Sequence, residues 1–180
     1  MITVLNRPTG SNPGSGGGLG TSIFLVPKSY LVSQPKRDVT SPNKIIADLA
    51  FDATNAAIEI YCTKETIEPT FSKLAGENAD CGGVENSIKI SHPSISADVL
   101  QFIAENGFGE EGYVFVKNER TGVIYIIGED GFTADMSDFA GKIGKTIADS
   151  TSVEITFTAK QPLPFAIFEG GGVFGIPVAP

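Results

Sequence analysis

The two cysteines and the single histidine carry the most reactive side chains of this 180-residue chain. A thiolate activated by an imidazole would be a nucleophile, and Cys62, Cys81 and His92 could also ligate a metal ion. Zinc needs about four ligands at recognisable spacing, which this set does not supply. His92 stands between a strand-like run and Pro93, as an exposed histidine in a turn often does. We therefore expect all three residues to be structural. A disulfide between the cysteines stays open, although synthesis in the cytoplasm favours free thiols.

Two glycine-containing stretches resemble nucleotide-binding loops. Gly144-Lys145-Thr146 has the end of a phosphate-binding loop, in which the lysine meets the phosphates and the hydroxyl meets magnesium. The glycine required five positions earlier is replaced by Phe139, so the spacing fails. In the Gly-rich stretch of residues 9–20, Leu19 stands where GxGxxG needs its third glycine. We expect a flexible arm there and no cofactor-binding residue in either stretch.

Paired acids flank the clearest hairpin of the chain. Glu110-Glu111 precede it and Glu129-Asp130 follow it. Two carboxylates at a suitable separation could hydrolyse a glycosidic bond, but 21 acidic residues make such pairs common in this chain. We interpret both pairs as solvated strand ends. The sequence thus predicts no catalytic, cofactor-binding or metal-binding residue, and a protein that is not an enzyme.

The hairpin itself is the stretch EGYVFVKNERTGVIYIIGEDG, residues 111–131. Two apolar, β-branched runs flank a polar turn, which predicts two antiparallel strands. Neither run alternates between apolar and polar residues, so both faces of the hairpin must be buried. The helix and the partner strands can cover one face. The other face needs either a second sheet of the same chain, as in a sandwich or barrel, or a neighbouring subunit, and we expect neighbouring copies of the protein to supply part of that cover.

Other segments give clearer or weaker signals. Ser96 can cap a helix over about residues 96–106, where an apolar stripe ends at Asn106-Gly107. Alternation predicts strands at residues 87–92 and 150–160, and apolar runs predict strands from Lys44 and from Ala56. Pro27 divides residues 22–32 into two short pieces typical of an edge strand. Loops are predicted for the polar segments, which are residues 36–43, 64–83 and 128–150.

These elements predict a mainly β fold, a sandwich or barrel of antiparallel strands with one flanking α-helix and extended arms. We expect a flexible Gly-rich N-terminal arm at residues 1–21, a single β-rich domain at 22–169 and a Gly/Pro-rich C-terminal tail at 170–180. No apolar run approaches the roughly 20 residues that span a bilayer. Residues 1–20 also lack the apolar centre of a signal peptide. The prediction is a protein made in the cytoplasm with no membrane span.

The charge is distributed unevenly along the chain. The net charge is −8, yet residues 1–44 carry five basic side chains and one acidic one, a balance of +4 that leaves −12 for the remainder. An acidic body should repel phosphate backbones, so tight binding of DNA or RNA is not expected. The basic segment can pack on the acidic body of its own chain or dock on the next copy. The sequence leaves both options open.

The order of elements over residues 45–168 resembles the tail-tube (major tail) proteins of long-tailed bacteriophages. The resemblance lies in a strand (SIKISH), a helix (SISADVLQFIAENG), the hairpin and a closing strand (STSVEITFTAKQPLPF). It implies a β-sandwich or barrel that assembles with itself into stacked, hexameric rings in the virion. Other virion tail proteins would be partners, and DNA would pass through the lumen without specific binding. The loops and residues 170–180 would form ring-to-ring contacts, and no catalytic residues carry over.

Two further interpretations stay open. A tail terminator or a capsid decoration protein would share the β-rich, acidic profile without a catalytic site. A small enzyme that uses Cys62, Cys81 or His92 belongs to a different class, and it lacks the partner groups expected of an activated nucleophile.

Overall fold

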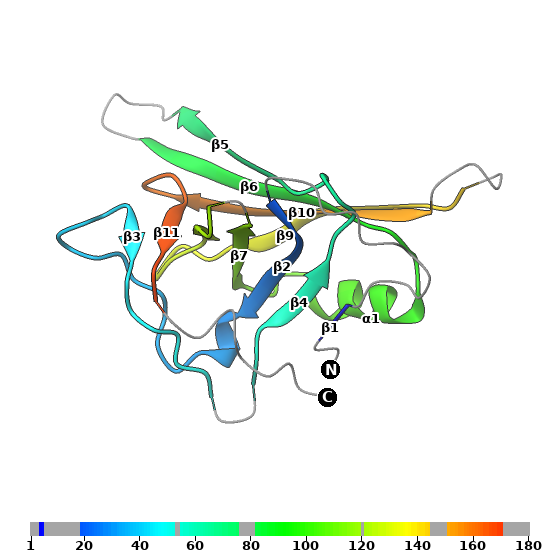
Figure 1. The fold of residues 1–180 in the computed structure, drawn as a ribbon, viewed down its shortest axis with the longest axis horizontal. Coiled ribbons are helices and arrows are strands. Elements are labelled where there is room, and N and C mark those ends of the chain that lie inside the picture. The colour runs from blue at the N-terminus through cyan, green and yellow to red at the C-terminus, as the bar shows by residue number, and fades with distance from the viewer. Residues whose placement is uncertain are drawn as a thin grey trace.

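The described residues form two β-sheets that pack face to face, with one α-helix beside them (Figure 1). The structure is a computed structural model that describes residues 4–5, 19–52, 55–75, 82–119, 121–144 and 151–170. The chain is therefore mainly β and sandwich-like, as predicted. Of the predicted arm and tail, residues 1–3, 6–18 and 171–180 lie outside the described residues.

The large sheet contains seven strands. In spatial order they are Val4–Leu5 (β1), Ile58–Tyr61 (β4), Leu19–Pro27 (β2), Gly112–Asn118 (β7), Ile124–Ile127 (β8), Ala166–Phe168 (β11) and Lys44–Ile45 (β3). The pairs β1–β4 and β11–β3 are parallel, and the other pairs are antiparallel. A short 3-10 helix, Lys28–Tyr30 (η1), follows β2. The predicted antiparallel sandwich thus carries a parallel strand pair at each end of this sheet.

The small sheet contains four strands and is antiparallel throughout. In spatial order they are Glu68–Ala75 (β5), Gly82–His92 (β6), Ser152–Gln161 (β10) and Asp135–Lys142 (β9). The pairing of β6 with β10 runs from Val84 opposite Gln161 to His92 opposite Val153. The β5–β6 and β9–β10 hairpins project at opposite ends of the molecule (Figure 1).

The helix α1, Ala97–Asn106, begins and ends where the sequence predicts. The Ser96 side chain accepts a hydrogen bond from the Val99 backbone N–H at 3.3 Å, which satisfies a donor in the first helical turn. Phe102 and Ile103 bury the apolar stripe in the core between the two sheets. The Gly107 N–H closes the helix by donating to the Ile103 carbonyl at 2.7 Å.

The β7–β8 hairpin is present, and both of its faces are buried within one chain. Val114 and Val116 belong to the core that faces the small sheet and α1. Tyr113 and Phe115 belong to a second apolar cluster on the opposite face. That cluster is completed by side chains from the same chain, including Leu31, Ile45, Leu49, Ala166 and Phe168. The expectation that neighbouring copies cover this face is therefore wrong, because the chain between β2 and β4 folds over the hairpin.

Three strand predictions need correction. Leu19–Pro27 is a central strand between β4 and β7, not an edge strand, because Pro27 stands at its last position and leaves the pairing before it intact. The expected loops at 64–83 and 128–150 contain β5 and β9. Of the strand predicted from Lys44, only Lys44–Ile45 pairs. The predicted strands at 87–92 and 150–160 are confirmed within β6 and β10.

Candidate functional site

Cys62 follows β4 and lies in the core between the two sheets. Its side chain is fully buried, and the thiol contacts the Ile60 carbonyl oxygen at 3.5 Å. Burial raises the pKa of the Cys62 thiol to about 12, because an apolar environment disfavours the thiolate. A protonated, inaccessible thiol is a poor nucleophile and a poor metal ligand. Cys81 lies outside the described residues.

His92 is buried, which contradicts the expected exposed turn histidine. It is the last residue of β6 and is only 1% exposed. Alternation along β6 explains this position, because residue 92 lies on the same sheet face as the buried Ile88 and Ile90. Its Nδ1 atom accepts from the Ser94 backbone N–H at 3.3 Å and so holds the turn that leads into α1.

The stretch that resembles a phosphate-binding loop is described only in part. Gly144 comes two residues after β9, and its N–H lies 3.4 Å from the Thr151 hydroxyl. Lys145 and Thr146 lie outside the described residues. Among the described residues, no group of three or more His, Cys, Asp or Glu side chains is placed to hold a metal ion.

The acidic pairs that flank the hairpin occupy different environments. Glu111 is exposed and forms an ion pair with Lys28 at 2.9 Å. The Lys28 ammonium, through a hydrogen bond and its charge, lowers the pKa of Glu111. Ser29 donates to Glu110 at 3.4 Å, also at the surface. The prediction of a solvated strand end is confirmed for this pair.

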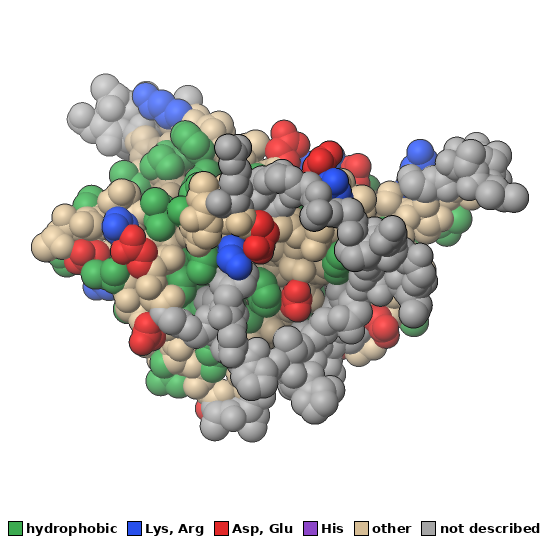
Figure 2. Space-filling model, in the orientation of Figure 1, with side chains coloured by type: hydrophobic (Ala, Val, Ile, Leu, Met, Phe, Trp, Pro, Cys, Tyr) green, Lys and Arg blue, Asp and Glu red, His purple; other side chains and the backbone are tan. Residues whose placement is uncertain are grey.

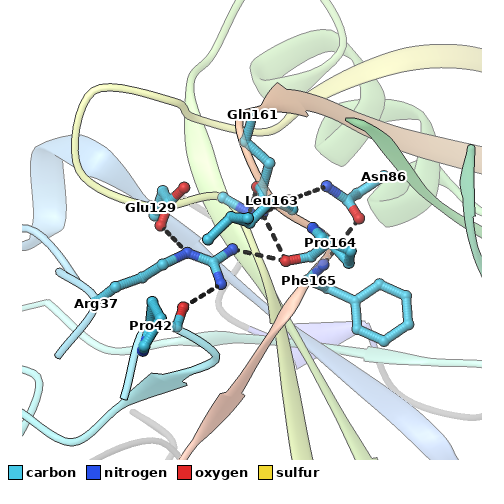
Figure 3. Close-up of polar contacts among 9 residues, drawn as sticks. Arg37, Pro42, Asn86, Glu129, Gln161, Leu163, Pro164 and Phe165 are labelled. Carbon is cyan, nitrogen blue, oxygen red and sulfur yellow. Dashed lines mark hydrogen bonds and ion pairs between the residues drawn. The ribbon is translucent and has the colours of Figure 1, made fainter. Parts of the chain in front are cut away.

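Glu129 is buried, so the same prediction is wrong for it. Its carboxylate forms an ion pair with the Arg37 Nε, and the two side chains are 10% and 11% exposed. Arg37 also donates to the carbonyl oxygens of Pro42 at 2.7 Å and Pro164 at 2.6 Å (Figure 3). The guanidinium thus connects three segments far apart in the sequence. The Glu129 charge is needed here because a buried guanidinium requires a counter-ion.

Two buried amides extend this polar cluster. The Gln161 side chain accepts from the Gly128 N–H at 3.1 Å and donates to the Leu163 carbonyl at 3.0 Å. The Asn86 side chain accepts from the Phe165 N–H at 2.9 Å and donates to the same Leu163 carbonyl at 3.3 Å. These bonds hold the crossover from the small sheet to the large one (Figure 3). The cluster therefore satisfies buried backbone groups and has no open position for a substrate.

Three basic side chains of residues 1–44 form ion pairs with acidic side chains of the same chain. Lys28 pairs with Glu111, Arg37 with Glu129, and Lys44 with Glu169 at 2.6 Å. On the face drawn in Figure 2, several basic side chains lie directly beside acidic ones. Of the two options that the sequence left open, packing on the acidic body of the same chain is the one observed for these residues.

The outer face of the small sheet is the most distinctive surface among the described residues. Along β6 and β10 every second side chain is buried, and the intervening ones point away from the large sheet. The outward side chains include hydroxyl groups from all four strands, at Thr70, Ser72, Ser87, Ser91, Ser137, Thr156 and Thr158. The face is therefore wide, polar and free of large apolar side chains along β6 and β10.

Charged groups on this outer face are mainly acidic. Lys89 pairs with Glu154 at 2.8 Å, and Lys160 lies 4.0 Å from Glu85. The outward carboxylates outnumber the outward lysines, the two sets being Glu68, Glu85, Asp135, Asp138 and Glu154 against Lys89, Lys142 and Lys160. A surface with this balance repels a phosphate backbone more than it attracts one.

Two open hollows lie at opposite ends of the same face. One, of about 700 Å³, is lined by side chains that include Glu85, Thr158 and Lys160. The other, of about 620 Å³, is lined by side chains that include Lys89, Ser91 and Glu154. Neither contains a nucleophile with an adjacent base, so neither has the arrangement of an acyl-transfer site.

Comparisons with known proteins do not assign this chain to a family. No family model, no curated protein and no solved structure matches this chain. Within the part of the chain that the structure describes, no helix is long and apolar enough to cross a bilayer. Function must therefore be inferred from the surfaces themselves.

The four-stranded small sheet was not predicted from the sequence, because only two of its strands were predicted. β5 and β9 were assigned to loops, so its two edges could not be recognised. One signal was available, because the outward residues of β10 include Thr156 and Thr158, which are typical of a strand face that meets water.

Proposed function

We propose that this chain is a structural protein of a virion, whose copies join through their small sheets into rings that stack as a phage tail tube. The observation that supports this most directly is the small sheet, which has one buried face, one polar face and two edges. Among the described residues neither β5 nor β9 has a strand on its outer side. Unpaired edges of this length are templates for pairing with another chain.

The strand directions suit pairing between successive copies. Because all three strand pairs of the small sheet are antiparallel, β5 and β9 run in opposite directions. Rotation about the ring axis preserves each strand's direction along that axis, including where the strands tilt against the axis and their register is staggered, as closure of a sheet requires. The β9 edge of one copy would therefore meet the β5 edge of the next as another antiparallel pair. Repetition of this head-to-tail contact generates a closed ring if the rotation closes.

The polar outer face suits the inside of such a ring. A closed sheet has no remaining edges, and its two faces become an inner and an outer wall. The apolar face of the small sheet is already covered by the large sheet and α1, so the polar face is the one left to line a lumen. Its excess of carboxylates would let DNA pass without adhering.

The two hairpins of the small sheet offer contacts between rings. They project at opposite ends of the molecule, along the direction of the strands (Figure 1). In a ring whose strands tilt against its axis, one hairpin would point toward the ring above and the other toward the ring below. The hexameric ring number comes from the resemblance to tail-tube proteins.

Electron microscopy of the purified protein tests this proposal. Tubes with a continuous lumen are expected. Single rings that do not stack would favour a tail terminator, and trimers would favour a decoration protein. A protein that stays monomeric at high concentration, in low and high salt, would contradict the proposal.

A second experiment tests which face lines the lumen. The double variant Thr156→Lys/Thr158→Lys adds positive charge to the outer face, whereas Leu100→Lys adds it to an exposed position of α1. Both variants are assembled with duplex DNA at low salt and the tubes are sedimented. Only the Thr156→Lys/Thr158→Lys tubes should retain DNA, and release it as salt rises. Equal retention by both variants would contradict a lumen lined by the small sheet.

A further inference from the structure

Each edge of the small sheet carries an exposed aromatic cluster. On β5, Phe71 is 58% exposed and meets Phe165 edge to face, with ring centroids 5.4 Å apart. Phe165 in turn meets Tyr125 of β8 at 5.5 Å. On β9, Phe139 is 38% exposed and meets Phe108, which is 79% exposed, at 5.9 Å. Exposed apolar groups gathered in this way often mark interaction sites.

The two clusters lie on the same face of the small sheet. Phe71 is opposite Asn86 and Phe139 is opposite Ile155, and both of these partners are buried on the side that faces the large sheet. Because side chains alternate between the two faces of a strand, Phe71 and Phe139 point to that same side. Neither ring lies on the polar face. An edge-to-edge contact between copies would therefore bring both rings into one apolar layer beneath the joined sheet.

We propose that Phe71 of one copy packs directly against Phe139 of the next, and that this contact sets the register between copies. The proposal rests on the head-to-tail pairing of the proposed function, and its occupant is a second copy of this chain. In an antiparallel pair, placing 71 opposite 139 also places Glu68 opposite Lys142 and Thr70 opposite Ala140. Each of these pairs shares a face of the sheet.

The charges on the polar face support this register. Glu68 is the first residue of β5 and Lys142 is the last residue of β9, and both are exposed. Opposite charges directly across two strands are favourable, and like charges are unfavourable. A shift of two residues in either direction separates Glu68 from Lys142 and replaces the ring-to-ring contact by Phe71 against Gly141 or Ser137. The aromatic contact and the charge pair therefore agree on one register.

Cysteine cross-linking tests the register directly. In a Cys81→Ser background, Thr70→Cys with Ala140→Cys places two thiols across the seam, where directly opposed Cβ atoms are about 4.5–5.5 Å apart. Oxidation should give a ladder of covalent oligomers on a non-reducing gel. The matched control, Thr70→Cys with Lys142→Cys, is displaced by two residues and should give at least ten-fold less product.

Substitution of the rings tests the contact itself. Phe71→Ser and Phe139→Ser should each reduce assembly, followed by light scattering, at least ten-fold at a fixed protein concentration. Leu100→Ser, an equally exposed apolar residue on α1, should leave assembly unchanged. Thermal unfolding of each variant separates loss of assembly from loss of folding, and the cysteine ladder tests the register without removing either ring.

The outcomes distinguish this inference from the proposed function. A ladder from the Thr70/Ala140 pair together with assembly lost in both phenylalanine variants supports the inference. Rings or tubes in the microscope with a stronger ladder from the displaced pair overturn it and leave the tail-tube proposal standing. Normal assembly of both phenylalanine variants also overturns it. Monomers in the microscope, with no ladder from either pair, overturn both.

Discussion

The two sheets of this protein differ in how much of their surface the chain itself covers. In the large sheet, β7 has four successive residues that are fully buried, Tyr113 to Val116, because the small sheet lies on one face and residues 31–51 lie on the other. In the small sheet, β10 alternates between buried and exposed residues, and the edges β5 and β9 stay open. One half of the molecule is covered on both faces within a single chain, and the other half has an exposed polar face and two open edges.

The sequence carries this difference in its hydrophobic pattern. A strand covered on both faces is apolar at every position, as in YVFV, whereas a strand covered on one face alternates, as in VEITFTA. A continuous apolar run shows that both faces are covered, but it does not show what covers them. The alternating strand, β10, has only one apolar face, which its own chain covers. It nevertheless belongs to the small sheet, which has an exposed face and open edges.

The largest expected effect concerns the buried hairpin. Phe115 is fully buried and meets Phe168 edge to face at 5.2 Å. Phe115→Ala should lower the free energy of unfolding by about 3–5 kcal/mol, because it removes a large buried ring and leaves a cavity. Urea unfolding at low protein concentration gives this value.

The control substitution for Phe115→Ala lies on the polar face of the small sheet. Thr156→Ala should change the free energy of unfolding by no more than about 0.5 kcal/mol, since the side chain points to solvent. If Phe115→Ala destabilises only the assembled protein, then the cover of this face comes from neighbouring copies after all. The contrast between the two sheets would then be wrong.

Strands whose stability comes from their own apolar residues could be predicted from the sequence. The hairpin has two continuous apolar runs around a polar turn, α1 has an apolar stripe with helical spacing, and β10 alternates between apolar and polar residues. β5 and β9 could not be predicted, because their sequences, EPTFSKLA and DMSDFAGK, contain prolines, glycines and charges with few apolar residues. These two become strands by pairing with β6 and β10. That pairing depends on contacts distant in sequence, which local patterns do not record.

A second prediction concerns the ion pair that holds residues 31–51 over the large sheet. Arg37→Met should lower the free energy of unfolding by about 1.5–3 kcal/mol, the range for hydrogen bonds to charged groups. The change leaves Glu129 without its counter-ion and two carbonyl oxygens without their donor. Urea unfolding again provides the measurement.

The neighbouring Lys36 offers a control of similar length and charge. Lys36 is exposed, so Lys36→Met should have an effect below about 0.5 kcal/mol. Equal effects of the two substitutions would indicate that net charge, not the buried contact, matters. If Arg37→Met impaired assembly without lowering the free energy of unfolding, residues 31–51 would instead form a contact between copies.

The candidate surface was harder to predict than the fold. Charge counting over residues 1–44 indicated a contact with an acidic surface, but the sequence does not say whether that surface belongs to the same chain. The geometry of Arg37 answers this for one residue, because the guanidinium contacts Glu129 and the Pro164 carbonyl oxygen, which lie in two distant segments of the same chain. The polar face required knowledge of β5 and β9, so no reading of β10 alone could have revealed its width.

The smallest expected effect tests whether water reaches the apolar layer between the two sheets. Burial raises the pKa of Cys62 from 9.0 to about 12. A thiol that keeps its proton longer in the folded state contributes stability that is fully present below pH 9 and is lost as pH rises toward 12. At pH 10 this loss amounts to roughly 1 kcal/mol.

Cys62→Ala isolates this contribution from other alkaline titrations, such as that of Tyr113, whose pKa burial also raises to about 12. Urea unfolding at pH 8 and pH 10 gives the alkaline loss for the parent and for the variant. The loss should be smaller by roughly 1 kcal/mol in Cys62→Ala, whereas Ser91→Ala on the polar face should leave it unchanged. An identical alkaline loss in all three proteins would mean that water reaches the thiol. The two sheets would then be separated by a wetter layer than their buried side chains indicate.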